Sequence, residues 1–293
     1  MKLTHNRAAL LMVAVTLLWS TAGVVTRHLD AARSFEVTFW RACFTVLTLL
    51  LVLPLVRGRQ VFAAMLGAGR AFWLSGLCWS VMFTAYMVAL TLTSVGNVLI
   101  TMALGPLMTA LMARAFIGHR IPVRTWVAIA VAGAGIAYMY GSQLHSGQMV
   151  GTLIALCVPL AGATNWTVTQ HAHANGSDVD LVPAVFVGAV LSAAITLPLA
   201  WPLQATRHDL GLLAYLGVFQ LAIPCVLSVV CAQVLKAPEI SLLALLEVVF
   251  GILLAWVGAG EAPGATVAVG GTLVIGALVA NELLGWRQRS TLT

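Results

Sequence analysis

Charged residues are scarce in this chain. Of its 293 residues only 8% are Asp, Glu, Lys or Arg, whereas 61% are apolar, and the mean hydropathy is +1.00. A soluble globular domain carries about 25% charged and roughly 45–50% apolar residues. So little charge excludes a water-soluble protein and a disordered one. It predicts an integral membrane protein whose surroundings are the lipid bilayer.

The sequence also lacks the motifs of several other protein classes. The five cysteines lie inside apolar runs and form no Cys-x-x-Cys pair, so neither a disulfide framework nor a metal site is predicted. HExxH, Walker and GxGxxG motifs are absent, so we predict no catalytic residues, no cofactor and no enzyme activity. The net charge is +6, but the basic residues are scattered singly, so no nucleic-acid partner is expected.

Long apolar runs are the dominant feature of the sequence. A transmembrane helix needs about 20 apolar residues, whereas the strands of a membrane barrel are roughly 10 residues long and alternate in polarity. The runs are continuous in Leu, Val and Ala, which favours helices. The sequence therefore predicts an all-α integral membrane fold with ten transmembrane helices. The ten runs span residues 8–27, 36–56, 71–92, 95–116, 123–141, 150–171, 181–201, 209–234, 239–258 and 264–285.

The distribution of Lys and Arg predicts the orientation of these helices. With a cytoplasmic N-terminus, eleven of the fifteen basic residues fall in cytoplasmic segments. Three others, Arg27, Arg33 and Arg207, fall in outer segments, and Arg41 lies within a span. Because cytoplasmic loops carry the excess of basic residues, both termini are predicted to be cytoplasmic.

The two halves of the chain carry similar short segments. Residues 20–28 and 163–171 share Thr, Val, Thr and His at one offset. Five spans per half would make the second half enter from the opposite side of the membrane. The sequence thus predicts two inverted five-helix repeats, residues 1–141 and 142–293, that form one structural unit. Repeats of this kind place a binding site near the midplane and expose it alternately to the two sides.

Several motifs in the predicted spans are typical of one superfamily. They are Trp19-Ser20, Phe39-Trp40-Arg41, Leu104–Leu107, Leu246–Phe250 and Gly260-Glu261. With these motifs the chain resembles the drug/metabolite transporter superfamily, in its ten-helix form with two EamA-type repeats. It departs from the common pattern at Ser20, His119 and Val248, where members usually carry Gly, Glu and Pro.

The resemblance implies a secondary transporter of the bacterial inner membrane that exports a small-molecule substrate. Among members, the chain is most similar to exporters of aromatic and other neutral amino acids. One alternative is a broad-specificity exporter of drugs or metabolites, and another is a membrane enzyme acting on a lipid or peptide. The sequence sets no oligomeric state and is compatible with a monomer.

Polar and aromatic residues within the spans are the candidate substrate-binding residues, because such groups face the bundle interior. Aromatic rings could hold the apolar side chain of a zwitterion, and rings and carbonyl groups could hold its ammonium. The alternative for each is helix packing, or a place in the interfacial aromatic belt. The predicted site residues are Trp19, Tyr86, Asn97, Asn165, Trp166 and Glu247.

Two charged residues inside spans allow several interpretations. Glu247 is the only acid deep within a span, and it could hold a substrate amine, carry a proton or bond a neighbouring helix. Arg41 lies about five residues into its run, so it is expected to reach the interface or to pair with Glu36. An anion-guiding role is the alternative for Arg41. Glu261 and Glu282 lie at span ends and are expected to be solvated.

Proline and glycine predict where helices bend and where they pack closely. Pro106 and Pro224 lie centrally in their runs, so kinks are predicted there. Small residues let helices approach each other closely, and they predict a contact between the two halves. The glycines concerned are Gly133, Gly135, Gly270, Gly271 and Gly276.

Overall fold

Helices form all the regular secondary structure in residues 4–117, 122–143, 149–174, 182–232, 234–235 and 243–290, which are the residues that the computed structural model describes. Within these described ranges, seven helical segments are long and apolar enough to cross a membrane. Three shorter apolar helical segments cover Val123–Met139, Met149–Asn165 and Leu246–Ala259. The all-α membrane fold predicted from the sequence is therefore confirmed for the described residues.

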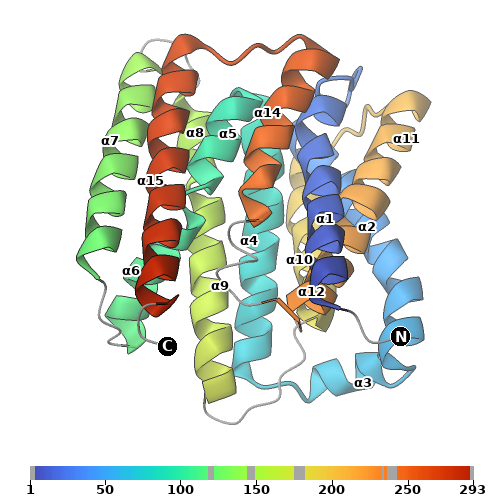
Figure 1. The fold of residues 1–293 in the computed structure, drawn as a ribbon. Coiled ribbons are helices and arrows are strands. Elements are labelled where there is room, and N and C mark those ends of the chain that lie inside the picture. Colours follow the sequence, from blue (N-terminus) through green and yellow to red (C-terminus); the bar gives the residue numbers. More distant parts are fainter. Residues whose placement is uncertain are drawn as a thin grey trace.

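Among the described residues, the first part of the chain contains four helices of 21–24 residues, and they run lengthwise through the bundle (Figure 1). A short helix, α3, lies across one end and was not predicted, because it is too short to leave an apolar run. The helices are α1 (His5–Thr26), α2 (Ser34–Arg57), α3 (Val61–Leu66), α4 (Arg70–Leu92), α5 (Val95–Met102), α6 (Gly105–Ile117) and α7 (Val123–Gln143).

The second part of the chain contains more interrupted helices than the first. One of the interruptions is a π-helical segment, η1, which continues directly from α11 into α12. The elements are α8 (Met149–Ala155), α9 (Cys157–Ala174), α10 (Val182–Ala200), α11 (Arg207–Tyr215), η1 (Leu216–Ala222), α12 (Ile223–Ala232), α14 (Leu246–Ala259) and α15 (Ala265–Ser290).

The irregular positions in two of the helices coincide with the central prolines. The run at 95–116 breaks between α5 and α6, so that Pro106 falls at the start of α6. There the missing amide proton of proline costs no helical hydrogen bond. η1 ends at Ala222, two positions before Pro224. The wider π turn therefore lies where the proline ring crowds the preceding turn and where its missing amide proton removes a helical hydrogen bond. The run at 150–171 also breaks, at Leu156 between α8 and α9.

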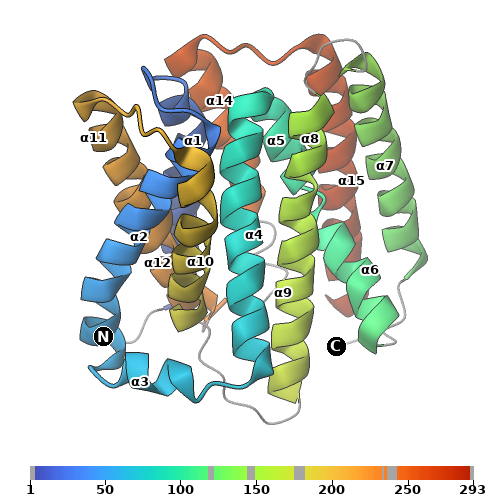
Figure 2. The same ribbon diagram turned by 180° about the vertical axis from the view of Figure 1, so that it is seen from behind.

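The two ends of the bundle differ in what they contain. α1 begins and α15 ends at the same end, together with α3; we call this the lower end (Figures 1 and 2). The upper end holds the connections at residues 27–33, 93–94, 201–206 and 260–264. α14 occupies only the upper half of the bundle, so its first turn lies at mid-height (Figure 1).

α7 and α15 lie side by side at one edge of the bundle and touch through glycines (Figures 1 and 2). A Cβ atom added at Gly135 would lie 2.8 Å from the carbonyl oxygen of Gly270, and one added at Gly270 would lie 2.7 Å from that of Gly135. The predicted close packing is confirmed for this pair. It is wrong for Gly133 and Gly276, where an added Cβ would meet nothing within 4 Å.

The outer surface of the bundle carries large apolar side chains. Leu55 and Val257 are each 85% exposed, and Leu51 is 72% exposed. Soluble monomers rarely expose contiguous apolar surface on this scale. Such side chains are suited to contact with lipid tails.

Candidate functional site

Arg41, in the second turn of α2, is buried and bonded to a side chain from the other half of the chain. Only 3% of its surface is exposed. Its Nε and Nη2 atoms donate to Oε1 of Gln220, at 3.2 and 2.8 Å, and Gln220 is itself buried. The expectation that Arg41 reaches the interface or pairs with Glu36 is therefore wrong.

Glu36 is not available to Arg41 because it holds a loop at the upper end. Its Oε1 atom accepts from the backbone amides of Gln204 and Ala205 at 2.8 and 2.7 Å, and from the indole of Trp40 at 3.4 Å. The two backbone donors lie more than 160 residues away in sequence. Neighbouring sequence alone could not reveal them.

The π-helical segment η1 brings Gln220 to Arg41. A Cβ atom added at Gly217 would lie 2.8 Å from the carbonyl oxygen of Arg41 and 3.0 Å from the amide nitrogen of Thr45, so η1 touches the backbone of α2. The hydroxyl of Thr45 donates to the carbonyl oxygen of Gly217 at 3.1 Å. π-Helical turns inside α-helices are frequent at functional sites, because they reorient a few side chains locally.

Aromatic residues surround the Arg41 guanidinium. Its Cζ atom lies 5.9 Å from the ring centre of Phe83 and 5.7 Å from that of Tyr86, both on α4. These distances fall within the cation–π range of about 6 Å. Gln220 Nε2 donates to the carbonyl oxygen of Trp19 on α1 at 3.1 Å. α1, α2, α4 and η1 thus meet around one positive charge.

Glu247 provides a negative charge near the same point. It lies in the first turn of α14, at mid-height in the bundle, and is partly exposed. It interacts electrostatically with Arg41 and Tyr86, although the described residues show no direct ion pair between Glu247 and Arg41.

We call this group of residues the Arg41 cluster. It contains three residues that the sequence predicted for the site, namely Trp19, Tyr86 and Glu247. Sequence reasoning missed Gln220, whose signal was a polar side chain in the middle of the apolar run at 209–234. The members of the cluster are Trp19, Arg41, Phe83, Tyr86, Gln220 and Glu247.

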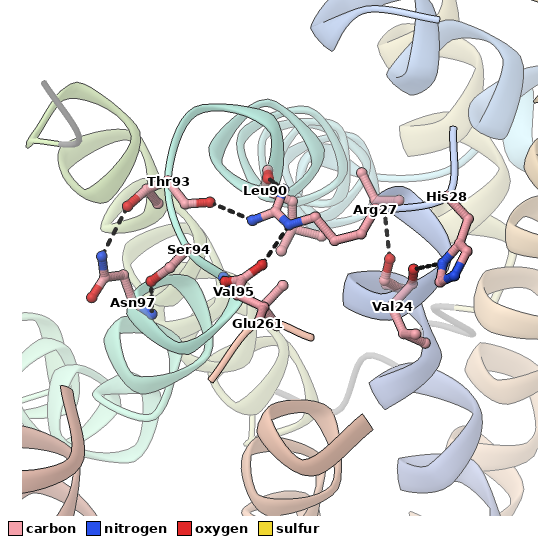
Figure 3. Close-up of polar contacts among 11 residues, drawn as sticks. Val24, Arg27, His28, Leu90, Thr93, Ser94, Val95, Asn97 and Glu261 are labelled. Carbon is pink, nitrogen blue, oxygen red and sulfur yellow. Dashed lines mark hydrogen bonds and ion pairs between the residues drawn. The ribbon is translucent and has the colours of Figure 1, made fainter. Parts of the chain in front are cut away.

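The other three predicted site residues lie elsewhere or are described only in part. Asn97 is buried at the corner between α4 and α5, where its Nδ2 atom donates to Thr93 Oγ1 at 2.9 Å (Figure 3). Asn165 is buried on α9, which packs against α4 and α6. Trp166 follows it on α9, and its side chain lies outside the described residues.

A second polar group ties together three segments at the upper end (Figure 3). Arg27, which follows α1, has its Nε atom 2.5 Å from Glu261 Oε2. Its two terminal nitrogens donate to the carbonyl oxygens of Leu90 and Thr93, at 2.5 and 2.7 Å. One guanidinium therefore joins the end of α1, the end of α4 and the connection between α14 and α15. We call this arrangement the upper closure.

Glu261 completes the upper closure from the other side. Its Oε1 atom accepts from the backbone amide of Val95 at 2.6 Å, and its side chain is only 23% exposed. The prediction that Glu261 is solvated is therefore wrong, while the side chain of Glu282 lies outside the described residues. Gly260, with φ at +67°, ends α14 and turns the chain so that Glu261 points to α5.

A small cavity adjoins the upper closure. Its volume is about 30 Å³, which is sufficient for a water molecule. A cavity of this size is too small to hold an amino acid. The residues lining the cavity include Ser94, Gly96, Glu261 and Val267.

Asp209 fixes another connection at the upper end. Its carboxylate accepts from the backbone amides of Asp30, Ala31 and Ala32, and it completes a capping box with Thr206 at the start of α11. His208 contacts Asp30 at 3.1 Å, which brings Asp30, His208 and Asp209 within 4.8 Å of one another. The Asp209 oxygens already accept hydrogen bonds from backbone amides. This group therefore serves to hold the connection at residues 27–33 against the start of α11, and it is not interpreted as a metal site.

An all-helical membrane bundle with charged and aromatic residues buried between its helices is the architecture of a membrane transporter. The family model of the EamA-like transporter family matches residues 6–141 and again residues 149–281. The chain belongs to the EamA-like transporter family, within the drug/metabolite transporter superfamily that its motifs resemble. The match occurs twice, so the family's repeat is present in both halves.

A comparison with solved structures agrees with this assignment. One crystal structure matches 97% of this chain and 99% of its own length, with a TM-score of 0.64 and 18% sequence identity. At this identity the likeness shows a shared fold. None of the curated proteins matches the sequence of this chain.

Proposed function

We propose that this transporter exports small metabolites, in particular aromatic and other neutral amino acids, by alternating access to the Arg41 cluster. The observation that carries the proposal is a buried guanidinium that lies beside the ring of Tyr86 and bonds Gln220. Gln220 in turn bonds the carbonyl oxygen of Trp19 on α1, and α1 packs against α14, which carries Glu247. Charges within membrane helices are costly and mark substrate pathways. A neutral amino acid combines an apolar side chain, which suits the aromatic rings, with an ammonium group, which suits Glu247.

The proposed arrangement in the membrane is ten spans in two inverted five-helix repeats, residues 1–141 and 142–293. The seven long and three shorter apolar helical segments correspond to the ten apolar runs and support this count. The double family match supports the division into halves. A single chain contributes the whole Arg41 cluster, so the proposal requires no second subunit.

The proposed location is the bacterial inner membrane, with both termini in the cytoplasm. The lower end carries the start of α1 and the end of α15, together with Arg57, Arg59 and Arg70. The upper end carries Arg27, Arg33 and Arg207. This asymmetry supports a cytoplasmic lower end by the positive-inside rule.

The upper closure supports an alternating-access mechanism. The Arg27–Glu261 pair joins α1, α4 and the α14–α15 connection, so opening the upper end would separate these contacts. Substrate would enter from the lower end, bind at the Arg41 cluster and leave when the closure opens. We propose that the substrate's own concentration gradient drives this cycle, with Glu247 orienting the substrate rather than carrying a proton.

Counterflow in proteoliposomes tests the proposed substrate class. The full-length chain is placed in vesicles that are loaded with an excess of unlabelled solute. The same solute in labelled form is then added outside the vesicles. We expect transient accumulation of labelled phenylalanine and leucine, but none of glutamate or of a lipophilic cationic dye. Dye accumulation without amino-acid accumulation would instead identify a drug exporter.

Two matched variants test the place of binding. Tyr86→Ala should lower counterflow of phenylalanine at least tenfold, because it removes a buried ring beside Arg41. Trp256→Ala should leave counterflow unchanged, because Trp256 is 52% exposed on the outer surface. Equal counterflow in both variants, at equal expression, would contradict the proposed site.

A further inference from the structure

We infer that Arg41 binds the carboxylate of the substrate and that Glu247 faces its ammonium group, so that the site selects zwitterions. The inference rests on the proposed function for the substrate class, and it adds which charge holds which end of the molecule. It also replaces the expectation that Arg41 reaches the interface or pairs with Glu36.

The charge of Arg41 is buried, and no acidic side chain among the described residues bonds it directly. Within the described residues, the hydrogen bonds of its guanidinium go to one atom, the neutral amide oxygen of Gln220. A guanidinium has five N–H donors, of which this oxygen takes two. A buried arginine normally bonds a carboxylate, because a desolvated charge without one is costly. A carboxylate on the substrate would supply the missing partner.

The hydrogen bonds to Gln220 leave one end of the Arg41 guanidinium without a partner among the described residues. Gln220 occupies the edge of the guanidinium formed by Nε and Nη2. The amide cannot rotate away without cost, because its Nε2 atom is bonded to the carbonyl oxygen of Trp19. The end formed by the two terminal nitrogens is therefore the one left for a ligand. Arginine forms bidentate hydrogen bonds to carboxylates through such an end.

Glu247 supplies a charge opposite to that of Arg41, from the first turn of α14, which packs against α1. Glu247 interacts with Arg41 electrostatically but forms no direct ion pair with it in the described residues. A direct pair would satisfy both groups and leave nothing for a ligand. Because neither charge pairs with the other among the described residues, both can bind a ligand, and an α-amino acid offers each one an opposite charge. The rings of Phe83 and Tyr86 lie beside Arg41 and can contact an apolar side chain.

The test measures binding of three related probes to the purified full-length chain in lipid nanodiscs. L-Phenylalanine carries both charges, phenethylamine lacks the carboxylate, and 3-phenylpropionate lacks the ammonium. We expect wild type to bind phenylalanine at least about tenfold more tightly than phenethylamine, because a charged hydrogen-bonded contact contributes about 1.5–3 kcal/mol. Arg41→Gln should abolish this preference, whereas Arg33→Gln, at an exposed arginine eight positions earlier, should keep it.

A second variant separates ligand binding from a purely structural role of Arg41. Gln220→Glu keeps the link between α2 and η1 but places a carboxylate on the guanidinium. We expect its melting temperature to equal or exceed that of wild type, while phenylalanine binds at least about tenfold more weakly. Unchanged phenylalanine binding in a folded Gln220→Glu variant would overturn the inference. So would equal binding of phenylalanine and phenethylamine to wild type.

The same probes distinguish failure of the inference from failure of the proposed function. If phenylalanine is transported but the preference over phenethylamine survives in Arg41→Gln, the inference is overturned and the function stands. If no amino acid binds, but 3-phenylpropionate binds to wild type and not to Arg41→Gln, the carboxylate site stands and the function is overturned. If neither phenylalanine nor 3-phenylpropionate binds, the inference and the proposed function are both overturned.

Discussion

Arg27 and Glu261 lie 234 positions apart in sequence and form an ion pair at the upper end of the bundle, with Nε and Oε2 separated by 2.5 Å. Each partner also bonds the backbone near the corner between α4 and α5. Arg27 donates to the carbonyl oxygens of Leu90 and Thr93, and Glu261 accepts from the amide of Val95. Two side chains thereby hold three segments from both halves of the chain (Figure 3).

Glu261→Ala should weaken the upper closure. It removes the ion pair and the acceptor for Val95, and charged hydrogen bonds of this kind contribute about 1.5–3 kcal/mol each. We expect the melting temperature of the purified protein to fall by several degrees. The control is His208→Ala, which breaks a pair whose side chains are 58% and 60% exposed. An equal, small change in both variants would show that the closure contributes nothing to stability.

The contact between α7 and α15 should tolerate no side chain at Gly135. Gly135→Ala would place a methyl group 2.8 Å from a backbone oxygen of α15, and such overpacking costs about 1–3 kcal/mol. Gly133→Ala, on the same helix, meets nothing within 4 Å and should be neutral or slightly stabilising. Thermal unfolding in detergent measures both. A Gly135→Ala variant as stable as Gly133→Ala would contradict the close approach of the two helices.

The positions of the helices could be predicted from the sequence because their signal is local. A run of about 20 apolar residues is sufficient to predict a membrane helix. The prolines also indicated where helices change, since a helix break lies beside Pro106 and a π segment ends two positions before Pro224. The type of irregularity could not be predicted, because the same proline allows a break, a kink or a π turn.

The partners of the charged residues could not be predicted, because they are distant in sequence. Arg41 was expected to reach the interface or to pair with Glu36, five positions away, but it bonds Gln220, 179 positions away. Glu261 was expected to be solvated because it lies at a span end. Only the folded chain shows that Arg27 and the amide of Val95 meet it there. Trp19, Tyr86 and Glu247 were selected as polar or aromatic residues inside spans. In the structure Tyr86 lies beside Arg41, and Trp19 accepts a hydrogen bond from Gln220 through its carbonyl oxygen.

Single cysteines at the two ends should be labelled from opposite sides of the membrane. Arg59→Cys lies at the lower end and Gln204→Cys at the upper end, and both positions are exposed. In a background without the five native cysteines, we expect a membrane-impermeant maleimide to label Gln204→Cys in intact cells. Arg59→Cys should be labelled only after the cells are opened. Labelling of both positions in intact cells would contradict the proposed topology.

Glu247→Gln should weaken substrate binding. It should not change the response of transport to a pH gradient. If the substrate gradient drives transport, an imposed pH gradient should not concentrate phenylalanine in wild-type vesicles. Counterflow should fall in Glu247→Gln, because the carboxylate that faces the ammonium is lost. pH-driven accumulation in wild type that disappears in Glu247→Gln, while counterflow persists, would instead make Glu247 the proton carrier.

Reversible cross-linking of the upper closure tests alternating access most directly. In a cysteine-free background, Arg27→Cys and Glu261→Cys are combined and treated with a short bifunctional methanethiosulfonate, which a reductant removes. We predict that phenylalanine counterflow stops when the two positions are tethered and returns after reduction. The monofunctional reagent, which adds bulk without a tether, should leave counterflow running. Undiminished counterflow through a fully tethered protein would contradict the account, because the substrate would then cross the membrane without opening the upper end.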